Sequence, residues 1–534
     1  MTGVFSGIGV GSTAALGSAF WLRHKEFKPE KSKHDPHFEE QILSQAIAQS
    51  AAELRAEFSK LEAESQQIMD ALLLIFEDPE LVSMASPHLA EGWDAATALK
   101  LALDDFASLF EGDSDFETRA GDLQAIAHRA ISKLRGTPSD FEFPVDSKIV
   151  VIARDLSPLD TAKFNSSVVG VVTELGGPTS HAAIICRSRG IPAVVACGNL
   201  DSIVDGSPVL VDPEGNRIVV DGKISDATSA MEFVALSDEP LIPVRANIGS
   251  VEDAALASKT AAVGVGLFRT EVLYLGATRE PDVSQQVANY QAVLETAPLG
   301  EVTVRTLDAG SDKPVPFLGL AAEENPALGV RGYRLASLHP QFLKNQLQAI
   351  ALAAEKSGRE VAVMAPMIAT VAEAREFAEL GRAVGLHKIG IMIETPAIAS
   401  MVHRLGGIVD FLSIGTNDLS QYLFAADRMH PSLGALLNPW QPALLHSVNE
   451  VVSQANKLGI PVGICGESAA NPLLSVVFAG MGAASVSVSP AAVGAVASAL
   501  RSITHDGARK LAELVLSADS PEAAIATARR QAGV

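Results

Sequence analysis

The first part of the chain shows two different periods of hydrophobic residues. Up to about Leu22, glycines alternate with Val, Ile and Phe, a pattern typical of short strands joined by tight turns. From Phe38 to Ile75, apolar residues recur mostly at steps of three and four, which predicts a long amphipathic helix. Similar patterns predict further helices over Ala95–Leu109 and Thr118–Leu134. We therefore expect a helical block to follow a β segment.

The pattern changes again at Gly136. One helix is expected from about His181 to Arg189, among short β-branched runs separated by Gly, Pro and Asp. The runs are Ser147–Ile152, Val168–Thr173, Ala193–Ala196, Pro208–Val211 and Arg217–Val220. They predict a compact α/β unit that the N-terminal strands complete, with the helical block inserted in it.

After a helical connector near Ser225–Leu236, strand and helix patterns alternate. Helices are expected, for example, over Pro340–Glu355 and Val371–Val384. The expected strands are Ile242–Ile248, Val263–Phe268, Val302–Arg305, Val361–Ala365, Ile389–Ile393, Phe411–Ile414 and Pro461–Ile464. One more strand, around Asn325–Leu328 or near Val486, would complete a (β/α)8 barrel. The competing fold is a doubly wound open sheet.

Polar or reactive residues close almost every one of these strands at its carboxyl end. They are Asn247, Arg269, Arg305, Glu394, Asn417 with Asp418, and Cys465. In a barrel all these ends converge on one face, where active sites are built. An open sheet would spread them along an edge, so their grouping favours the barrel.

Composition narrows the classes of function. The chain has 534 residues, with 63 acidic side chains against 41 Lys and Arg and a net charge of −22. This charge argues against nucleic acids and anionic membranes as main partners. A small anionic substrate then requires a local group of arginines. Three cysteines cannot form a disulfide framework in so long a chain and fit a reducing, cytoplasmic compartment.

Part of the acidic excess lies in the helical block, which we interpret as a docking surface. The alternative is a helical hairpin with ordinary solvated charges. The acidic residues expected on its surface are Glu39, Glu40, Glu53, Glu57, Glu62, Glu64, Glu77, Asp78 and Glu80.

The segment from Gly176 to Ala183, GGPTSHAA, carries the first chemical motif. Its two glycines allow a tight turn into a helix, and Thr179 and Ser180 are good N-cap residues. His181 then lies in the first helical turn, where free N–H groups favour an anion. We read His181 as a candidate phosphoryl acceptor, although a lone histidine is more often a surface or core residue.

Arginines carry the second group of motifs. Arg269 ends the segment GVGLFR, and Arg305 with Lys313 flanks the glycine turn of RTLDAGSDK. Guanidinium groups bind phosphate or carboxylate in a bidentate manner. Arg331 and Arg428 could add positive charge to the same site. A surface salt bridge is the alternative for Arg269.

A carboxylate pair and a cysteine complete the motifs. Glu394 and Asp418 follow neighbouring strands without a nearby His or Cys cluster, which suits Mg²⁺ rather than zinc. Either carboxylate alone could instead form a buried ion pair with the arginines. Cys465, at a strand end between glycines, is expected to be an accessible proton donor or acceptor, whereas Cys186 and Cys197 read as inert core residues.

Taken together and in this order, the motifs resemble enzyme I of the bacterial phosphoenolpyruvate-dependent sugar phosphotransferase system. GGPTSHAAI resembles the phosphohistidine motif of that family, and GLFRTEVLY and RTLDAGSDK resemble its phosphate-binding strands. IMIETPA, GTNDLSQY and GICGE resemble its metal and acid motifs. The resemblance covers nearly the whole chain.

The resemblance implies a role for each matched residue. His181 corresponds to the phosphoryl acceptor, and Cys465 to the acid that protonates enolpyruvate. Glu394 and Asp418 correspond to Mg²⁺ ligands. Arg269, Arg305, Arg331, Asn417 and Arg428 correspond to residues that bind substrate. Thr161 is a weaker match to a residue near the phosphohistidine.

The resemblance also implies a domain plan and partners. Residues 1–24 and 137–224 would form a swivelling phosphohistidine domain, residues 25–136 a helical carrier-binding domain, residues 225–239 a linker, and residues 240–534 a phosphoenolpyruvate-binding TIM barrel. The implied partners are phosphoenolpyruvate, a small histidine-containing phosphocarrier protein and a second copy of the chain, bound through the barrel.

The sequence departs from the family motifs at a few positions, and alternative functions have to be weighed. Pro178, Glu174 and Ser311 replace residues common in the family, but none is a reacting group. The related dikinases and synthases need an ATP-binding domain, for which the length leaves no expected room. A catalytically inactive or regulatory relative is the rival from another class. It is disfavoured because every reacting residue is present.

Overall fold

The computed structural model describes residues 3–11, 13–22, 27–58, 73–108, 126–136, 143–145, 147–177, 180–213, 215–226, 235–274, 277–311, 315–321, 323–428, 430 and 433–532. The chain divides into two compact units, Met1–Ala230 and Met231–Val534. Among the described residues, no helix has both the length and the apolar character that a membrane span requires.

The first unit is built on a mixed sheet that, in the described part of the chain, has eight strands in the order β1-β8-β7-β3-β4-β5-β6-β2. The strands are β1 (Val4–Ser6), β2 (Ile8–Val10), β3 (Ala15–Trp21), β4 (Ile149–Ala153), β5 (Val168–Thr173), β6 (Ala193–Val195), β7 (Pro208–Asp212) and β8 (Arg217–Val220). Strands β3 to β6 are parallel, and the outer pairs are antiparallel. The N-terminal strands therefore complete the α/β unit, as the sequence predicts.

Alternation of side chains along β4 explains how this sheet is covered on both faces. Val151 belongs to a core cluster with Ala182, Ala183 and Cys186 from helix α7 (His181–Arg189). Val150 faces a second cluster on the opposite side. A second short helix, α6 (Pro158–Ala162), also contacts α7. The sheet thus provides a fixed support for the start of α7.

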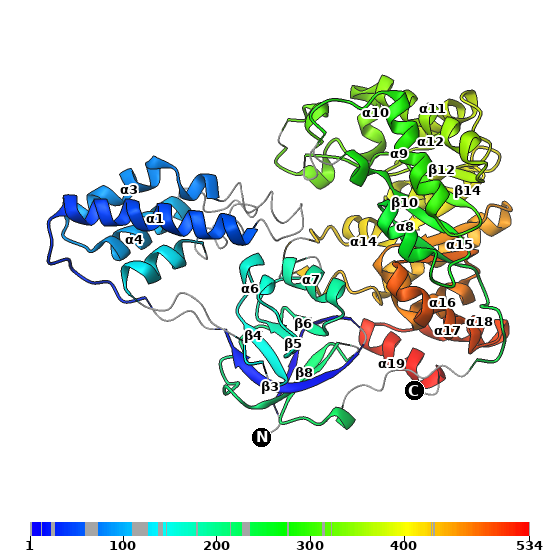
Figure 1. The fold of residues 1–534 in the computed structure, drawn as a ribbon. Helices are drawn as coiled ribbons and strands as arrows, with labels where there is room; N and C mark the ends of the chain where they lie inside the picture. Colours follow the sequence, from blue (N-terminus) through cyan, green and yellow to red (C-terminus); the bar gives the residue numbers. More distant parts are fainter. Residues whose placement is uncertain are drawn as a thin grey trace. The chain divides into compact units, whose positions relative to one another are not determined.

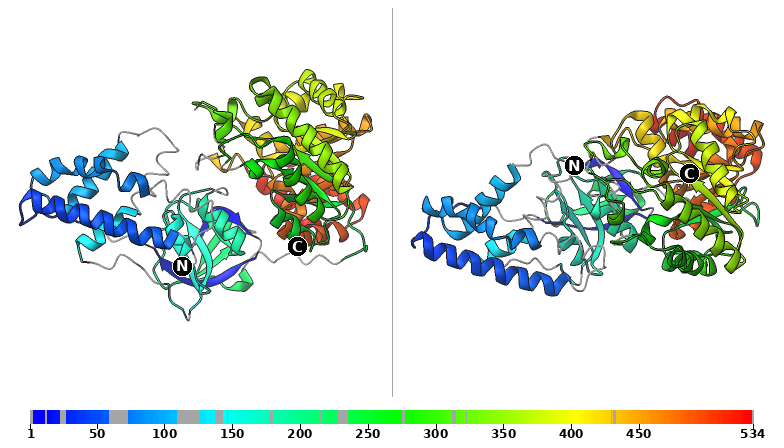
Figure 2. Two further views of the ribbon diagram at one scale, coloured as in Figure 1. Left: turned by 45° about the horizontal axis from the view of Figure 1, so that its top comes forward. Right: turned by 90° about the horizontal axis from the view of Figure 1, so that it is seen from above.

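The helical insert lies between β3 and β4 in the chain. It contains α1 (Pro36–Phe58), α3 (Pro79–Ala90), α4 (Ala95–Ser108) and a helical segment over residues 126–134. Helix α1 lies along α3 and α4 (Figures 1 and 2). The rest of the long helix expected as far as Ile75 falls partly on residues 59–72, outside the described part.

The apolar stripe of α1 agrees with the expected one except at its start. Ile47 and Leu54 are buried as the pattern predicts, together with Leu43 and Ala51, whereas Phe38 is exposed. The prediction that Glu39 lies on the surface of the helical block is wrong. Glu39 is buried because its carboxylate accepts hydrogen bonds from the Ser32 hydroxyl and, at 2.8 Å, from the Ala95 N–H. Burial of this carboxylate caps the start of α4.

The second unit is a closed barrel of parallel strands, eight in the described part of the chain (Figure 1). They are β9 (Val244–Ile248), β10 (Val265–Arg269), β11 (Val302–Arg305), β12 (Val361–Ala365), β13 (Ile389–Ile393), β14 (Phe411–Gly415), β15 (Val462–Cys465) and β16 (Ser485–Val488). The eighth strand is therefore the one near Val486. The alternative around Asn325–Leu328 is wrong, because that segment forms a 3-10 turn, η4 (Pro326–Leu328).

Helices surround this barrel. They are α8 (Val251–Ala257), α9 (Val283–Thr296), α10 (Leu335–Leu338), α11 (Pro340–Ser357), α12 (Val371–Ala383), α13 (Pro396–Ser400), α14 (Thr416–Phe424), α15 (Pro442–Lys457), α16 (Pro472–Met481), α17 (Val493–Arg501), α18 (His505–Leu516) and α19 (Pro521–Ala532). A large apolar cluster fills the space between strands and helices, and a small one fills the barrel interior. Closure of the sheet excludes the open doubly wound alternative and brings the carboxyl ends of the strands to one face.

Candidate functional site

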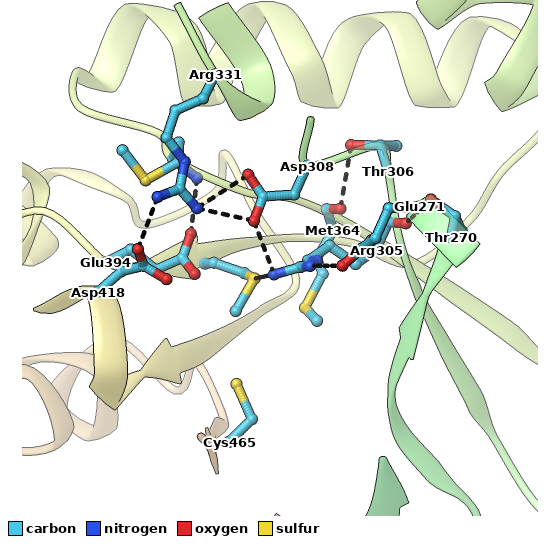
Figure 3. Close-up of polar contacts among 12 residues, drawn as sticks. Thr270, Glu271, Arg305, Thr306, Asp308, Arg331, Met364, Glu394, Asp418 and Cys465 are labelled. Atoms are coloured by element: carbon cyan, nitrogen blue, oxygen red, sulfur yellow. Dashed lines mark hydrogen bonds and ion pairs between the residues drawn. The ribbon is translucent and has the colours of Figure 1, made fainter. Parts of the chain in front are cut away.

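Arg305, the last residue of β11, is held by two carboxylates at the carboxyl face of the barrel. Its guanidinium pairs with Glu271 and, at 3.2 Å, with Asp308 (Figure 3). Glu271 follows β10 in the 3-10 turn η2 (Thr270–Tyr274), and Asp308 follows Arg305 by three residues. Burial of Arg305 leaves its Nε without a partner among the described residues. The guanidinium therefore keeps its charge and is fixed in place.

Arg331 extends this network to the helix α14. Its Nη2 lies 3.0 Å from Asp308 Oδ2, and its Nη1 donates a hydrogen bond of 2.9 Å to Asp418 Oδ1. Arg428 Nη1 lies 3.7 Å from the other oxygen of Asp418. Asp308 and Asp418 thus hold the arginines as an alternating chain of charges. Because each of these buried charges has a partner, removal of one of them would leave another charge uncompensated.

Glu394 lies next to this chain directly after β13. It is almost fully buried, and its Oε2 accepts a 2.8 Å hydrogen bond from the Met367 N–H. A Cβ at Gly415 would lie 2.6 Å from Glu394 Oε1, so only glycine leaves room for this carboxylate. Burial, and then the nearby charges of Asp418 and Asp308, raise the pKa of Glu394 to about 8. Figure 3 shows the two carboxylates of Glu394 and Asp418 close together.

Among the described residues, no group of three or more His, Cys, Asp or Glu side chains is arranged to hold a metal ion. Asp418 is in part committed to arginines, as the ion-pair alternative expects. The chemistry of the donors nevertheless fits a hard cation. Two neighbouring carboxylates, one with a raised pKa, lower their mutual repulsion when a divalent cation lies between them. Such a cation would take its remaining oxygen ligands from substrate.

Cys465 ends β15 and belongs to the apolar cluster inside the barrel. The expectation of an accessible thiol is wrong, since the residue is 1% exposed. The Ser413 hydroxyl donates to its Sγ at 3.3 Å, and the thiol donates to the Ile414 carbonyl at 3.3 Å. Burial raises the pKa of Cys465 to about 11. The thiol therefore retains its proton at neutral pH.

Of the other residues singled out in the sequence, Arg269, Asn417 and Asn247 do not join the charged network in the described part of the chain. Arg269 ends β10 exposed, and it makes no hydrogen bond or ion pair with any residue that the structure describes. Asn417 lies on α14, and its Oδ1 accepts a hydrogen bond of 3.0 Å from the Glu467 N–H. Lys313 lies outside the described residues. Asn247 contacts Ser487 within the barrel and joins no charged network.

His181 is the first residue of α7, as expected, but its side chain lies outside the described part. Ser180 is the N-cap, and its hydroxyl accepts from the Ala183 N–H at 3.3 Å. Gly176 adopts a φ of +88°, which allows the turn that precedes this cap. The first-turn N–H groups of a helix are suited to an anion. Thr161 contributes its carbonyl oxygen to Arg189 Nη1 at 3.2 Å, near the other end of α7.

Comparison with known proteins gives three family matches in chain order. Residues 6–119 match the PEP-utilising enzyme N-terminal model, residues 145–222 the mobile domain, and residues 226–505 the PEP-binding domain. The phosphoenolpyruvate-protein phosphotransferase of Streptomyces coelicolor is 38% identical, over 98% of this chain and 97% of that protein. Those of Haloferax volcanii (37%; 96% and 97%) and Geobacillus stearothermophilus (33%; 98% and 97%) are similar over nearly their full lengths.

Proposed function

The chain belongs to the phosphoenolpyruvate-protein phosphotransferase (enzyme I) family, and we propose that it accepts the phosphoryl group of phosphoenolpyruvate on His181. The family reaction transfers this group to a small histidine-containing phosphocarrier protein and releases pyruvate. The observation that supports it most is the chain of charges from Glu271 to Arg428 at the carboxyl face of the barrel.

In this mechanism, Arg269 and Arg305 bind the substrate phosphate, while Arg331, Arg428 and Asn417 contact the substrate beside it. Lys313 adds a further positive charge. Glu394 and Asp418 would hold Mg²⁺. When bound, this ion would supply positive charge that stabilises the transferring phosphoryl group and the leaving enolate. The carboxylates that orient the arginines keep them in place before substrate arrives.

A His181 ring nitrogen attacks phosphorus, so that an N–P bond forms as the phosphate ester P–O bond breaks. The electron pair remains on the leaving enolate oxygen. Cys465 then donates its proton to the methylene carbon, which yields pyruvate. His181 passes the phosphoryl group to the histidine of the carrier, which the helical insert binds.

The domain boundaries predicted from the sequence, a homodimer through the barrel, a cytoplasmic location and a place as the first step of sugar uptake complete this proposal. Sedimentation velocity on the full chain tests the dimer. A single species with the mass of one chain at micromolar concentration would contradict it.

Separation of the two units tests the division of labour between them. A fragment of residues 1–230 is expected to take phosphoryl groups from phosphorylated carrier protein but not from phosphoenolpyruvate, because the charged network lies in the second unit. Transfer of labelled phosphate to the fragment, followed by gel electrophoresis under alkaline conditions, measures both reactions. Direct use of phosphoenolpyruvate by the fragment would contradict the division.

Loss of the Cys465 thiol is expected to slow the reaction at its protonation step. Cys465→Ala should reduce pyruvate formation about 10²- to 10⁴-fold, the usual contribution of a general acid. Exchange of phosphoryl groups with the carrier should stay unchanged. Cys197→Ala removes a half-buried thiol in the first unit and is the matched control, expected to keep full activity. A fully active Cys465→Ala variant would show that another group protonates the enolate.

A further inference from the structure

The side chain of Gln346 on α11 is fully buried at the rear of the charged network. Its Oε1 accepts a 3.0 Å hydrogen bond from the Leu307 N–H, two residues after Arg305. Its Nε2 donates to Thr270 Oγ1 at 3.2 Å. The Thr270 hydroxyl in turn donates to the Arg305 carbonyl at 2.9 Å. One amide is therefore linked to two backbone groups of the segment Arg305–Asp308: directly to the Leu307 N–H, and through the Thr270 hydroxyl to the Arg305 carbonyl.

A chain of hydroxyl groups fixes the orientation of this amide. Gln346 Nε2 also lies 3.0 Å from the Tyr290 hydroxyl, which is 2.5 Å from the Tyr274 hydroxyl. Tyr274 donates at 2.9 Å to Gln286 Oε1. This chain of hydroxyl groups ends at the carbonyl oxygen of Gln286, which can only accept a hydrogen bond. The protons of both tyrosine hydroxyls therefore point away from Gln346, and the Gln346 amide must donate its N–H to the Tyr290 hydroxyl. Its oxygen is thus directed at the Leu307 N–H.

Hydrogen bonds add to packing on this side of the segment Arg305–Asp308. Leu307 is buried in an apolar cluster, and a small pocket of about 20 Å³ beside it is lined by residues that include Thr306, Leu307 and Gln346. A pocket gives the adjoining backbone fewer van der Waals contacts than close packing does. The hydrogen bonds of the amide therefore supply a constraint in addition to packing.

We propose that Gln346 is a positioning residue for the phosphoenolpyruvate site, which sets the place of Arg305 and Asp308 through the Leu307 N–H and Thr270. The inference rests on the proposed function of these two residues. Asp308 also holds Arg331, so a shift of the segment displaces both guanidinium groups. Displacements near 1 Å in a substrate-positioning group can cost about 10²-fold in rate.

Matched variants of the full chain test this role. Gln346→Met keeps the size of the side chain but removes its hydrogen bonds. Arg359→Met is the matched control: it also removes side-chain hydrogen bonds to the backbone, here to the Leu294 and Ala297 carbonyls, and among the described contacts it touches neither Gln346 nor the Arg305–Asp308 segment. Thr270→Val keeps the shape of that side chain and breaks the same link from its other end. It serves also if Gln346→Met fails to fold.

The readouts are kcat and KM for phosphoenolpyruvate, the midpoint of thermal unfolding, and phosphoryl exchange with the carrier. Gln346→Met is expected to lower kcat/KM for phosphoenolpyruvate about 10- to 100-fold while exchange is unchanged. Arg359→Met should lower the thermal midpoint but leave kcat/KM nearly unchanged, because the backbone that it holds precedes β11. In the Thr270→Val background, the effect of Gln346→Met on kcat/KM should shrink, because both residues act through one link.

Equal effects of Gln346→Met and Arg359→Met on kcat/KM would overturn the inference and reduce Gln346 to a stabilising residue. The inference would also be overturned if the double variant Gln346→Met/Thr270→Val lost kcat/KM by the product of the two single losses. The wild-type chain separates these results from a failure of the proposed function. If wild type uses phosphoenolpyruvate and Gln346→Met matches it, this inference alone fails.

Discussion

His181→Ala is expected to abolish phosphorylation of the chain by phosphoenolpyruvate, with a loss of about 10⁴-fold or more. The variant removes the attacking nitrogen and leaves the barrel network untouched. Phosphoenolpyruvate should still bind, because the arginines and carboxylates lie in the second unit. Calorimetric titration with phosphoenolpyruvate in Mg²⁺, beside an assay of labelled protein, measures the two properties separately.

His446→Ala is the matched control, since His446 is exposed on α15 and takes no part in the charged network. It should label as wild type does. Label on any other residue of His181→Ala would show that the acceptor has been assigned to the wrong histidine. Loss of phosphoenolpyruvate binding in His181→Ala would contradict the separation of acceptor and substrate sites.

Glu394→Gln is expected to have the second largest effect on activity. Removal of one carboxylate from the proposed Mg²⁺ site should lower the rate of pyruvate formation about 10³-fold, which corresponds to several kcal/mol of transition-state stabilisation. Exchange of phosphoryl groups with the carrier should persist. Titration of activity with Mg²⁺ measures the loss. A variant with wild-type activity and wild-type Mg²⁺ dependence would remove Glu394 from the site.

The same substitution has an expected signature in stability. The pKa of Glu394 in the folded chain, about 8, lies above the value of about 4.5 that an exposed glutamate has. Between these values the folded state binds a proton that the unfolded state does not, so stability falls as pH rises through this range. In chelator, wild type should therefore lose more thermal stability than Glu394→Gln between pH 5 and 8.

Glu301→Gln provides the contrast. Glu301 precedes β11 at the opposite end of the barrel and pairs with Arg245 at 2.7 Å and with Lys388. Its loss leaves two cations without their partner and should cost about 1–3 kcal/mol of stability with activity retained. A drop in stability for Glu394→Gln as large as that for Glu301→Gln would contradict the assignment of Glu394 to function.

Much of the fold could be predicted because its signals are local. Alternating and continuous apolar runs located the strands, and β5, β8, β11, β12 and β13 have the bounds expected. The eighth barrel strand was ambiguous because Ser485–Val488 carries two serines, which face small residues in the barrel. A Cβ at Gly266, for example, would meet the Ser487 Cβ at 2.6 Å. Such a strand needs the closed barrel to be recognised.

The site was predicted less completely because pairing between distant residues has no local signal. Arg305 and Glu394 were found by their places at strand ends. Asp308 and Glu271, which hold Arg305, lie within the motifs RTLDAGSDK and GLFRTE but were not singled out. The burial of Cys465 depends on β14, which supplies Ser413 and Ile414 as its partners. Gln346 lies in an ordinary amphipathic helix, and only the fold brings it to Leu307.

The proposed function depends on transfer of the phosphoryl group from phosphoenolpyruvate to His181. Incubation of the folded wild-type chain with Mg²⁺ and labelled phosphoenolpyruvate, followed by proteolysis in alkaline solution and peptide mapping, tests it directly. We expect one acid-labile, base-stable label in the peptide that contains His181, and transfer of this label to carrier protein when that protein is added. An unlabelled chain, or a label on another residue, would contradict it.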